Sequence, residues 1–350
     1  MMDVTRFARE HVPQITAVTI LVSYGVARNK FSPGGLVAGV LVSVVHMLHP
    51  WPAFFWLLTS FVFLGTLITK VSFLFYFTLL LLFLQQDQLS YLSTCFVEKT
   101  IADGTQIGHS AKAHLTQSSV GGSGGEGART SAQVLANSGF ACVLVGLHLY
   151  LLASTPFISS TLPISAGPYA PTLQKLLPIG IIAQYAAVAA DTFSSELGIL
   201  AKSNPILITA PWKQVPKGTN GGVTIEGLIY GGLGSLLITT VAILTLYVSP
   251  PRVAMNAKTA GVITVIGLMG SVIDSLLGAL VQATVTDKKS GKVIEGPGGQ
   301  RVRVAAGGGR VQSGIDLLTN NGVNFAMATI TSMLAMGVAY VLDLDLSSRG

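Results

Sequence analysis

Three carboxylates interrupt stretches of the sequence that are otherwise apolar. Asp191 and Glu196 follow directly on LLPIGIIAQYAAVAA, and Asp274 lies within GLMGSVIDSLLGALVQA. An acid inside a membrane helix costs roughly 2.5 to 3.5 kcal/mol on insertion scales, so it usually has a partner or a functional role. Aspartates from two helices can hold one Mg²⁺, which needs few carboxylates when substrate phosphates supply the other oxygens. The sequence therefore predicts a metal site at Asp191 and Asp274, with Glu196 as a further candidate ligand.

Helical geometry separates the first two acids. Asp191 shares a helix face with small residues at offsets of three, four and seven, which are Ser194, Ser195 and Gly198. Glu196 points about 140° away, so it reaches the same ion only if the helix ends or unwinds near Phe193. Two other interpretations stay open: Asp191 and Glu196 as a solvated helix end, and Asp274 as a buried acid hydrogen-bonded to a neighbouring helix.

A tight polar loop, QVPKGTNGGVT (214–224), is the next candidate. Its glycines let backbone N–H groups turn toward an anion, and its lysine adds a positive charge. A span beginning near Val223 would point its N-terminus at the same place. The motif predicts Lys217 as catalytic and a phosphate-binding set: Gly218, Thr219, Asn220, Gly221 and Gly222. An ordinary turn followed by a helix cap is the alternative, because the loop lacks the GKS or GKT of a P-loop.

Two groups of polar residues stand at the starts of apolar runs. The first forms a stripe typical of a lined cavity: Arg129, Gln133 and Asn137. Asn320, Asn321 and Asn324 resemble it, although helix capping by Asn320 or Asn321 is an equally good interpretation. Asn321 and Asn324 therefore join the first stripe as candidates for binding substrate or nucleotide.

These groups are set in a strongly apolar chain. Of its 350 residues, 50% are hydrophobic and 10% are charged, against about 25% charged residues in soluble domains. Apolar runs of near membrane-spanning length recur near residues 13–27, 34–48, 50–69, 132–153, 173–200, 222–248, 258–286 and 321–342. We predict an all-α polytopic bundle of about eight spans with glycine-rich cytosolic loops. It forms a single membrane domain, 1–350, in the lipid bilayer.

Three polar segments interrupt the spans: 100–130, 201–222 and the basic, glycine-rich 286–314. Two spans separate successive segments, so all three are expected on one side of the membrane. The positive-inside rule places that side in the cytosol and the N-terminus opposite, with an endomembrane such as the endoplasmic reticulum as the expected location. The net charge of +6 lies in loops, so it indicates orientation and anionic partners, not nucleic acid.

Two further features are assigned no chemistry. The apolar stretch 71–84 is only 14 residues long, and a span there would reverse the side of every later segment. We interpret it as re-entrant or interfacial. His46 and His49 stand three apart with no acid nearby, and they are interpreted as interfacial packing, not a metal site.

The sequence DTFSSELGILAKSNPILITAPWKQVPKGTNGGVTIEG (191–227) resembles the signature of the transmembrane protein 19 family, also described as domain of unknown function 92. The matching positions are Asp191, Thr192, Ser195, Glu196, Gly198, Val215, Pro216 and Gly218 to Gly222. RTSAQVLANSG and IDSLLGALVQ are similar to family blocks too, and the resemblance covers roughly residues 14–345. Members run from a GTLATK-like segment almost directly into a GHxxKAxLT-like one. Here 36 residues, 71–106, intervene, which predicts an insertion or a gene-model artefact.

This resemblance implies an activity. The plant and cyanobacterial branch of the family is associated with phytyl-phosphate kinase activity, which converts a prenyl monophosphate to the diphosphate. The signature also resembles, more distantly, CTP-dependent dolichol and phytol kinases. We therefore expect a prenyl-phosphate lipid as substrate, with Mg²⁺ and CTP or another nucleoside triphosphate. Phytyl phosphate itself is not expected, because the sequence has no plastid transit signature. A transporter or channel for an anionic solute and a non-enzymatic membrane protein are the alternatives.

Overall fold

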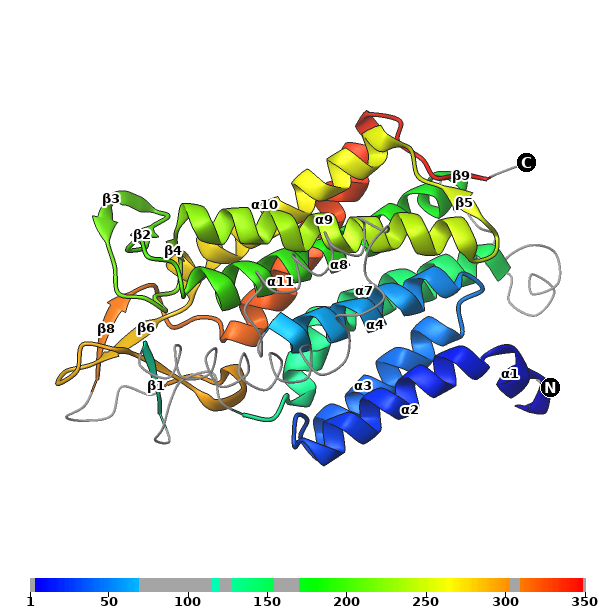
Figure 1. The fold of residues 1–350 in the computed structure, drawn as a ribbon. Helices are drawn as coiled ribbons and strands as arrows, with labels where there is room; N and C mark the ends of the chain where they lie inside the picture. The colour runs from blue at the N-terminus through cyan, green and yellow to red at the C-terminus, as the bar shows by residue number, and fades with distance from the viewer. Residues whose placement is uncertain (1–3, 69–114, 120–126, 154–169, 303–308, 349–350) are drawn as a thin grey trace, which may run out of the picture.

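A computed structural model describes residues 4–68, 115–119, 127–153, 170–302 and 309–348. Within these ranges, apolar helices occupy all eight predicted spans (Figure 1): α2 (Val12–Ala27), α3 (Pro33–Met47), α4 (Pro52–Ile68), α7 (Ser131–Ala153), α8 (Ala170–Gly198), α9 (Ile225–Val248), α10 (Ala257–Val281) and α11 (Asn320–Val341). A short helix, α1 (Val4–Glu10), precedes them. Helices α7 to α11 are long and apolar enough to cross a membrane, and α2 to α4 are shorter apolar helices. The predicted all-α polytopic fold is confirmed.

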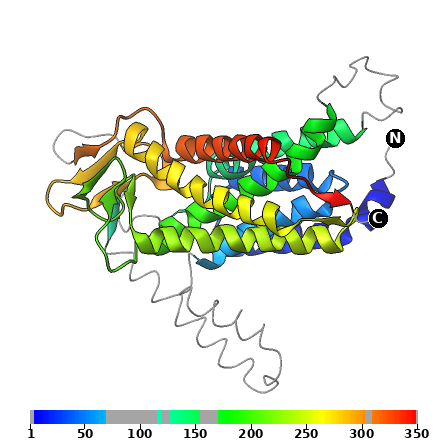
Figure 2. The same ribbon diagram turned by 90° about the horizontal axis from the view of Figure 1, so that it is seen from above.

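Helix α8 is the centre of the bundle. Every residue from 176 to 190 is buried, and α8 contacts α4, α7, α9, α10 and α11. A helix that is apolar all round belongs in the interior of a bundle. At 1.5 Å per residue its 29 residues extend about 43 Å. Figure 2 shows the other helices running beside it, so its last turns, which carry Asp191 and Glu196, reach one end of the bundle.

Small residues bring α9 and α10 close to α8. A Cβ added to Gly234 of α9 would lie 2.7 Å from the carbonyl oxygen of Ala189, and one added to Gly270 of α10 would lie 2.5 Å from the Cβ of Ala187. Such small residues let membrane helices approach closely. Because α8 and α10 both run toward the same end, the residues one turn beyond Ala187 and Gly270 also face each other. These residues are Asp191 and Asp274.

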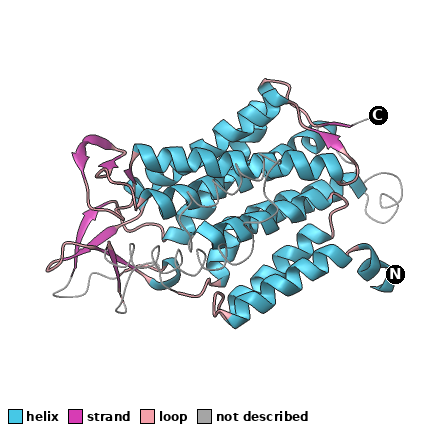
Figure 3. Ribbon diagram, viewed as in Figure 1, coloured by secondary structure: helices cyan, strands magenta, loops and turns pink. Residues whose placement is uncertain are grey.

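Most strands lie together at one end of the bundle, here called the sheet end (Figure 3). One sheet has the order β1-β7-β6-β8: β1 (Thr116–Ser118), β6 (Thr284–Asp287), β7 (Val293–Glu295) and β8 (Gly309–Ser313). Strands β1 and β7 are parallel, and the other pairs are antiparallel. A second has the order β3-β2-β4: β2 (Ile206–Leu207), β3 (Ala210–Gln214) and β4 (Gly222–Val223). At the other end, β5 (Val253–Ala254) pairs with β9 (Ser347–Ser348).

The polar segments differ in part from the sequence prediction. Figure 1 shows the described parts of all three at the sheet end, with both termini at the other end, as the alternation of spans predicts. The boundary predicted near residue 286 is wrong, because α10 ends at Val281 and Thr284 already pairs in β6. The loops expected there fold into strands. Segment 71–106, which contains the apolar stretch 71–84, lies outside the described residues, so both predictions made for it stay predictions.

His46 and His49 are buried inside the bundle and pack there, and their position at the membrane interface stays a prediction. The Tyr185 hydroxyl donates to Nε2 of His46 (2.7 Å), while Nδ1 of His46 contacts the Val42 carbonyl (2.9 Å). Nδ1 of His49 accepts from the backbone N–H of Trp51 (3.0 Å), so its Nε2 carries the proton that it donates to Nδ1 of His148 (2.9 Å). Buried polar groups need partners of this kind inside a bundle.

Candidate functional site

A cavity of about 1100 Å³ lies at the sheet end. Helices α2, α3 and α4 form one of its walls, and α7, α8, α10 and α11 form another. It is lined by every site residue predicted from the sequence: Arg129, Gln133, Asn137, Asp191, Glu196, Lys217, Gly218, Thr219, Asn220, Gly221, Gly222, Asp274, Asn321 and Asn324. The fold therefore gathers residues that are far apart in sequence around a single space.

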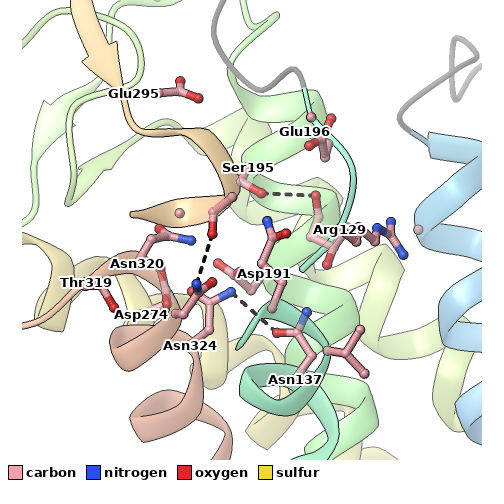
Figure 4. Close-up of a pocket in the computed structure, with 18 of the residues that line it drawn as sticks. Arg129, Asn137, Asp191, Ser195, Glu196, Asp274, Glu295, Thr319, Asn320 and Asn324 are labelled. Atoms are coloured by element: carbon pink, nitrogen blue, oxygen red, sulfur yellow. Dashed lines mark hydrogen bonds between the residues drawn. The ribbon is translucent and has the colours of Figure 1, made fainter. Parts of the chain in front are cut away.

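Two carboxyl groups form the most distinctive feature of this cavity (Figure 4). Asp191 and Asp274 are close enough to share a hydrogen bond, held there by the contact between Ala187 and Gly270 one turn earlier. One oxygen of Asp274, Oδ1, is buried and has no hydrogen-bond partner. A buried carboxylate oxygen without a partner is unfavourable. The pair is therefore suited to bind a cation or to share a proton.

Glu196 has a different environment from this pair. Helix α8 stays regular through Gly198, so the unwinding near Phe193 that would turn Glu196 toward the pair does not occur. Figure 4 shows Glu196 pointing away from Asp274, and its charge interacts with Arg129. Within the described ranges, no three His, Cys, Asp or Glu side chains form a group that could hold a metal ion. The predicted three-ligand set is therefore wrong, and the aspartate pair remains.

Arg129 supplies a fixed positive charge. Its backbone pairs with the single stretch 30–32, since its N–H donates to the Lys30 carbonyl (2.8 Å) and its carbonyl accepts from the Ser32 N–H (3.0 Å). Its guanidinium lies 5.9 Å from the centre of the Phe31 ring. Burial lowers the pKa of the Arg129 guanidinium, and the neighbouring Glu196 carboxylate opposes that shift. An arginine starts from so high a pKa that it stays charged, so it can attract an anion into the cavity.

Amide side chains from two helices meet across the cavity. The Asn324 Nδ2 of α11 donates to the Asn137 Oδ1 of α7 (3.4 Å), and the Asn137 carbonyl accepts from Gln184 Nε2 of α8 (3.0 Å). Asn321 Nδ2 donates to the Gly298 carbonyl (3.0 Å). The two polar groups seen separately in the sequence thus form one cluster beside the carboxyl pair (Figure 4).

Helix caps explain some of the polar residues at these helix starts. Gln133 Oε1 accepts from the Thr130 N–H (2.9 Å) and Thr130 Oγ1 accepts from the Gln133 N–H (3.4 Å), so Gln133 helps to cap α7. The proposed capping of α11 by Asn320 or Asn321 is wrong. Thr319 is the cap, since its Oγ1 accepts from the Gly322 N–H (3.1 Å). Asn321 is thereby left to line the cavity.

Replacing Thr319 with alanine is expected to lower the free energy of unfolding by about 1 kcal/mol, the usual cost of losing a cap. Asn320→Ala is the matched variant, because the Asn320 side chain makes only a 3.4 Å contact with Gln282 in the described structure. Thermal unfolding of the detergent-purified variants compares them. An equal loss from both variants would contradict the assignment of Thr319 as the cap.

The loop 214–224 uses several of its N–H groups internally. Thr219 N–H donates to the Pro216 carbonyl (3.2 Å), Asn220 N–H to Thr284 Oγ1 (3.0 Å), and Gly222 N–H to the Thr219 carbonyl (2.9 Å). These three N–H groups are therefore not turned toward an anion, and the phosphate-binding role of Gly218 and Gly221 stays a prediction. Gly221 has a φ of 77°, and an added Cβ would lie 2.4 Å from that of Ala279. The loop is packed against α10 one turn beyond Asp274 and helps to fix that helix.

Lys217 lines the same cavity from this loop. Its ammonium donates to the Ala201 carbonyl, just beyond the end of α8. The contact holds its positive charge at the cavity edge, near the end of the helix that carries Asp191. Its catalytic role stays a prediction.

One lining segment was missed by the sequence analysis. The turn η1 (Pro297–Gly299) follows β7 and meets the start of α11 through the hydrogen bond between Asn321 and Gly298. Gly298 and Gly299 have φ values of 64° and 74°, and an added Cβ on Gly299 would lie 2.8 Å from Asn321 Oδ1. The sequence GPGG signals a turn. It does not reveal that this turn lines the cavity.

Comparison with known proteins places the chain in a family. The family described as "Integral membrane protein DUF92" matches residues 16–74 and 73–332. The two matched stretches meet at residues 73 and 74, within segment 71–106. No solved structure matches the chain.

Three curated relatives are similar to parts of the chain. "Protein PGR" of Arabidopsis thaliana is 38% identical over 212 residues, which are 59% of this chain and 68% of that protein. "Uncharacterized membrane protein MJ0933" of Methanocaldococcus jannaschii is 42% identical over 104 residues, 30% of this chain and 40% of that protein. "Protein VTE6, chloroplastic" of Arabidopsis thaliana is 26% identical over 130 residues, 37% of this chain and 34% of that protein. The family match covers most of the chain, and the chain therefore belongs to the DUF92 family of integral membrane proteins.

Proposed function

We propose that this protein is a prenyl-phosphate kinase, which transfers a phosphoryl group from a nucleoside triphosphate to a prenyl monophosphate. The observation that carries the proposal is the buried pair of Asp191 and Asp274, beside Arg129 in one membrane-end cavity. The activity associated with the plant branch of the family gives the substrate class. The basic polar segments support a cytosolic sheet end, where nucleotide is available.

The aspartate pair fits a Mg²⁺ ion. Both side chains are carboxylates, and Asp274 Oδ1 is buried without a hydrogen-bond partner, so it is available to coordinate a cation. Mg²⁺ is usually held by one or two carboxylates, with phosphate oxygens and water as its other ligands. When bound, it would neutralise negative charge on the reacting phosphates.

The chain's own residues would position the two phosphates. A lipid phosphate oxygen forms a new bond to the γ-phosphorus as the bond to the β-phosphate oxygen breaks, which yields a prenyl diphosphate and a nucleoside diphosphate. Arg129 would hold the lipid phosphate, since a guanidinium matches phosphate geometry. Asn137 and Asn324 would orient phosphate oxygens from the other side, and Lys217 would attract the nucleotide phosphates. Positioning and charge neutralisation supply most of the catalysis in phosphoryl transfer.

Thermal unfolding tests the binding half of this proposal. Mg²⁺ with CTP, ATP or GTP is expected to raise the unfolding midpoint of the purified protein, because a ligand that binds only the folded state stabilises it. Asp274→Asn is expected to abolish that shift, whereas Asp345→Asn, at the opposite end, retains it. The absence of a shift with every nucleotide would contradict the proposal. Flux of an anionic solute into liposomes, without nucleotide binding, would favour a transporter.

A further inference from the structure

The cavity extends from its polar end into an apolar groove between α2, α3 and α4. The groove is lined by aliphatic and aromatic side chains: Val22, Leu36, Val42, Leu58, Phe61 and Val62. Three further lining residues, Ile20, Val40 and Phe63, are 62%, 37% and 54% exposed, so the bundle does not close over the groove. The outer surface of a membrane bundle faces hydrocarbon. The α2–α4 groove therefore opens sideways toward the lipid.

Three hydroxyl groups in this groove already donate hydrogen bonds within their own helices, so they need no polar ligand. Ser43 Oγ donates to the Gly39 carbonyl (2.8 Å), Thr59 Oγ1 to the Phe55 carbonyl (2.9 Å) and Thr66 Oγ1 to the Val62 carbonyl (2.7 Å). Each of these carbonyls lies one turn earlier in the same helix. These three hydroxyl groups therefore leave the groove suited to a hydrocarbon chain.

Two glycines of α3 in the cavity wall have different surroundings. A Cβ added to Gly35 would lie 2.1 Å from the Arg129 carbonyl oxygen, so close packing requires this glycine. A Cβ added to Gly39 would meet no atom within 4 Å. Glycine in a helix interior is unfavourable relative to alanine. Since packing does not require Gly39, its missing side chain leaves space in the groove.

We propose that the α2–α4 groove holds the hydrocarbon tail of the lipid phosphate and that Gly39 sets how bulky that tail can be. This inference rests on the proposed function, because the lipid's phosphate is taken to be held by Arg129 in the same cavity as the aspartate pair, where Asp274 Oδ1 is buried and unpaired. From Gly35, beside Arg129, to Ser43 the groove follows α3 for about 12 Å at 1.5 Å per residue. A longer tail leaves through the sideways opening into the bilayer.

Filling the space at Gly39 tests this proposal. Gly39→Phe is expected to weaken binding of geranylgeranyl phosphate roughly tenfold or more, because the new ring occupies volume that the long branched tail needs. Dimethylallyl phosphate, whose tail is a single isoprene unit, is expected to bind Gly39→Phe as it binds the wild type. Gly146→Phe is the matched control: an added Cβ there also meets no atom within 4 Å, and Gly146 does not line the cavity.

Equilibrium binding and phosphoryl transfer are measured in parallel for both lipids, with thermal unfolding as a check that each variant folds. If Gly39→Phe does not fold, Gly39→Leu replaces it in the same comparison. An equal change for the long and short lipids, or no change for either, would overturn the groove assignment. If Gly39→Phe weakens binding of geranylgeranyl phosphate but the wild type transfers no phosphate, the tail groove is supported and the kinase proposal is contradicted. If Gly39→Phe transfers phosphate to geranylgeranyl phosphate as fast as the wild type, the kinase proposal is supported and the tail groove is contradicted.

Discussion

Replacing Asp191 with asparagine is expected to reduce transfer of phosphate to a prenyl monophosphate by roughly 100-fold or more, which is about 2.7 kcal/mol of lost transition-state stabilisation. The amide keeps the size of the side chain but removes the negative charge beside Asp274. The substitution therefore lowers the affinity of the pair for Mg²⁺. The measurement is the rate of label transfer from γ-labelled CTP, ATP or GTP in detergent.

Asp343→Asn is the matched control for this variant. It makes the same chemical change just beyond the end of α11, away from the sheet end, and asparagine tolerates the positive φ of 47° at this position. Its transfer rate is expected to equal that of the wild type. Thermal unfolding shows whether both proteins fold alike. If Asp191→Asn folds and keeps more than half of the activity, the aspartate pair has no part in the chemistry.

Replacing Gly270 with valine is expected to destabilise the fold by about 1 to 3 kcal/mol, the usual cost of overpacking a tight core. Even the first added carbon would lie 2.5 Å from the Cβ of Ala187, 3.1 Å from its Cα and 3.2 Å from Thr331 Oγ1. Helices α8 and α10 must separate to relieve these contacts. The separation also moves Asp274 away from Asp191, so transfer activity falls in the molecules that remain folded.

The control lies in the same helix. Gly261→Val adds the same atoms to α10, where an added Cβ meets no atom within 4 Å, so its stability is expected to stay close to that of the wild type. The unfolding midpoint and the transfer rate are measured for both variants. If Gly270→Val unfolds at the same temperature as Gly261→Val, the contact with Ala187 does not hold the two aspartates together.

The length of the apolar runs was sufficient to locate the membrane helices, because lipid imposes one solution on a long apolar segment. The meeting of Asp191 and Asp274 was also within reach, since each acid stands in an apolar helix where an unpaired charge is costly. Its cause was not. The contact between Ala187 and Gly270 fixes the register of the two helices, and no local pattern distinguishes Gly270 from other helix glycines such as Gly261.

Local rules failed where several partners compete for one polar group. The sequence offered Asn320 or Asn321 as a cap for α11, and only the packed chain shows Thr319 in that role. The N–H groups of Thr219 and Asn220 were expected to face an anion, yet a neighbouring carbonyl and Thr284 take them. Glu196 lies beside Arg129, which is distant in sequence. Each outcome depends on contacts between segments that a single stretch of sequence does not contain.

The most direct measurement is phosphate transfer by the purified wild-type protein in detergent or liposomes. It uses γ-labelled CTP, ATP and GTP, Mg²⁺ and a panel of prenyl monophosphates, with Asp191→Asn and Asp343→Asn assayed alongside. Labelled prenyl diphosphate is expected from the wild type and Asp343→Asn, and a roughly 100-fold lower rate from Asp191→Asn. Folded wild-type protein that forms no labelled diphosphate with any donor and lipid, or an Asp191→Asn variant as active as the wild type, would contradict a kinase built on the aspartate pair.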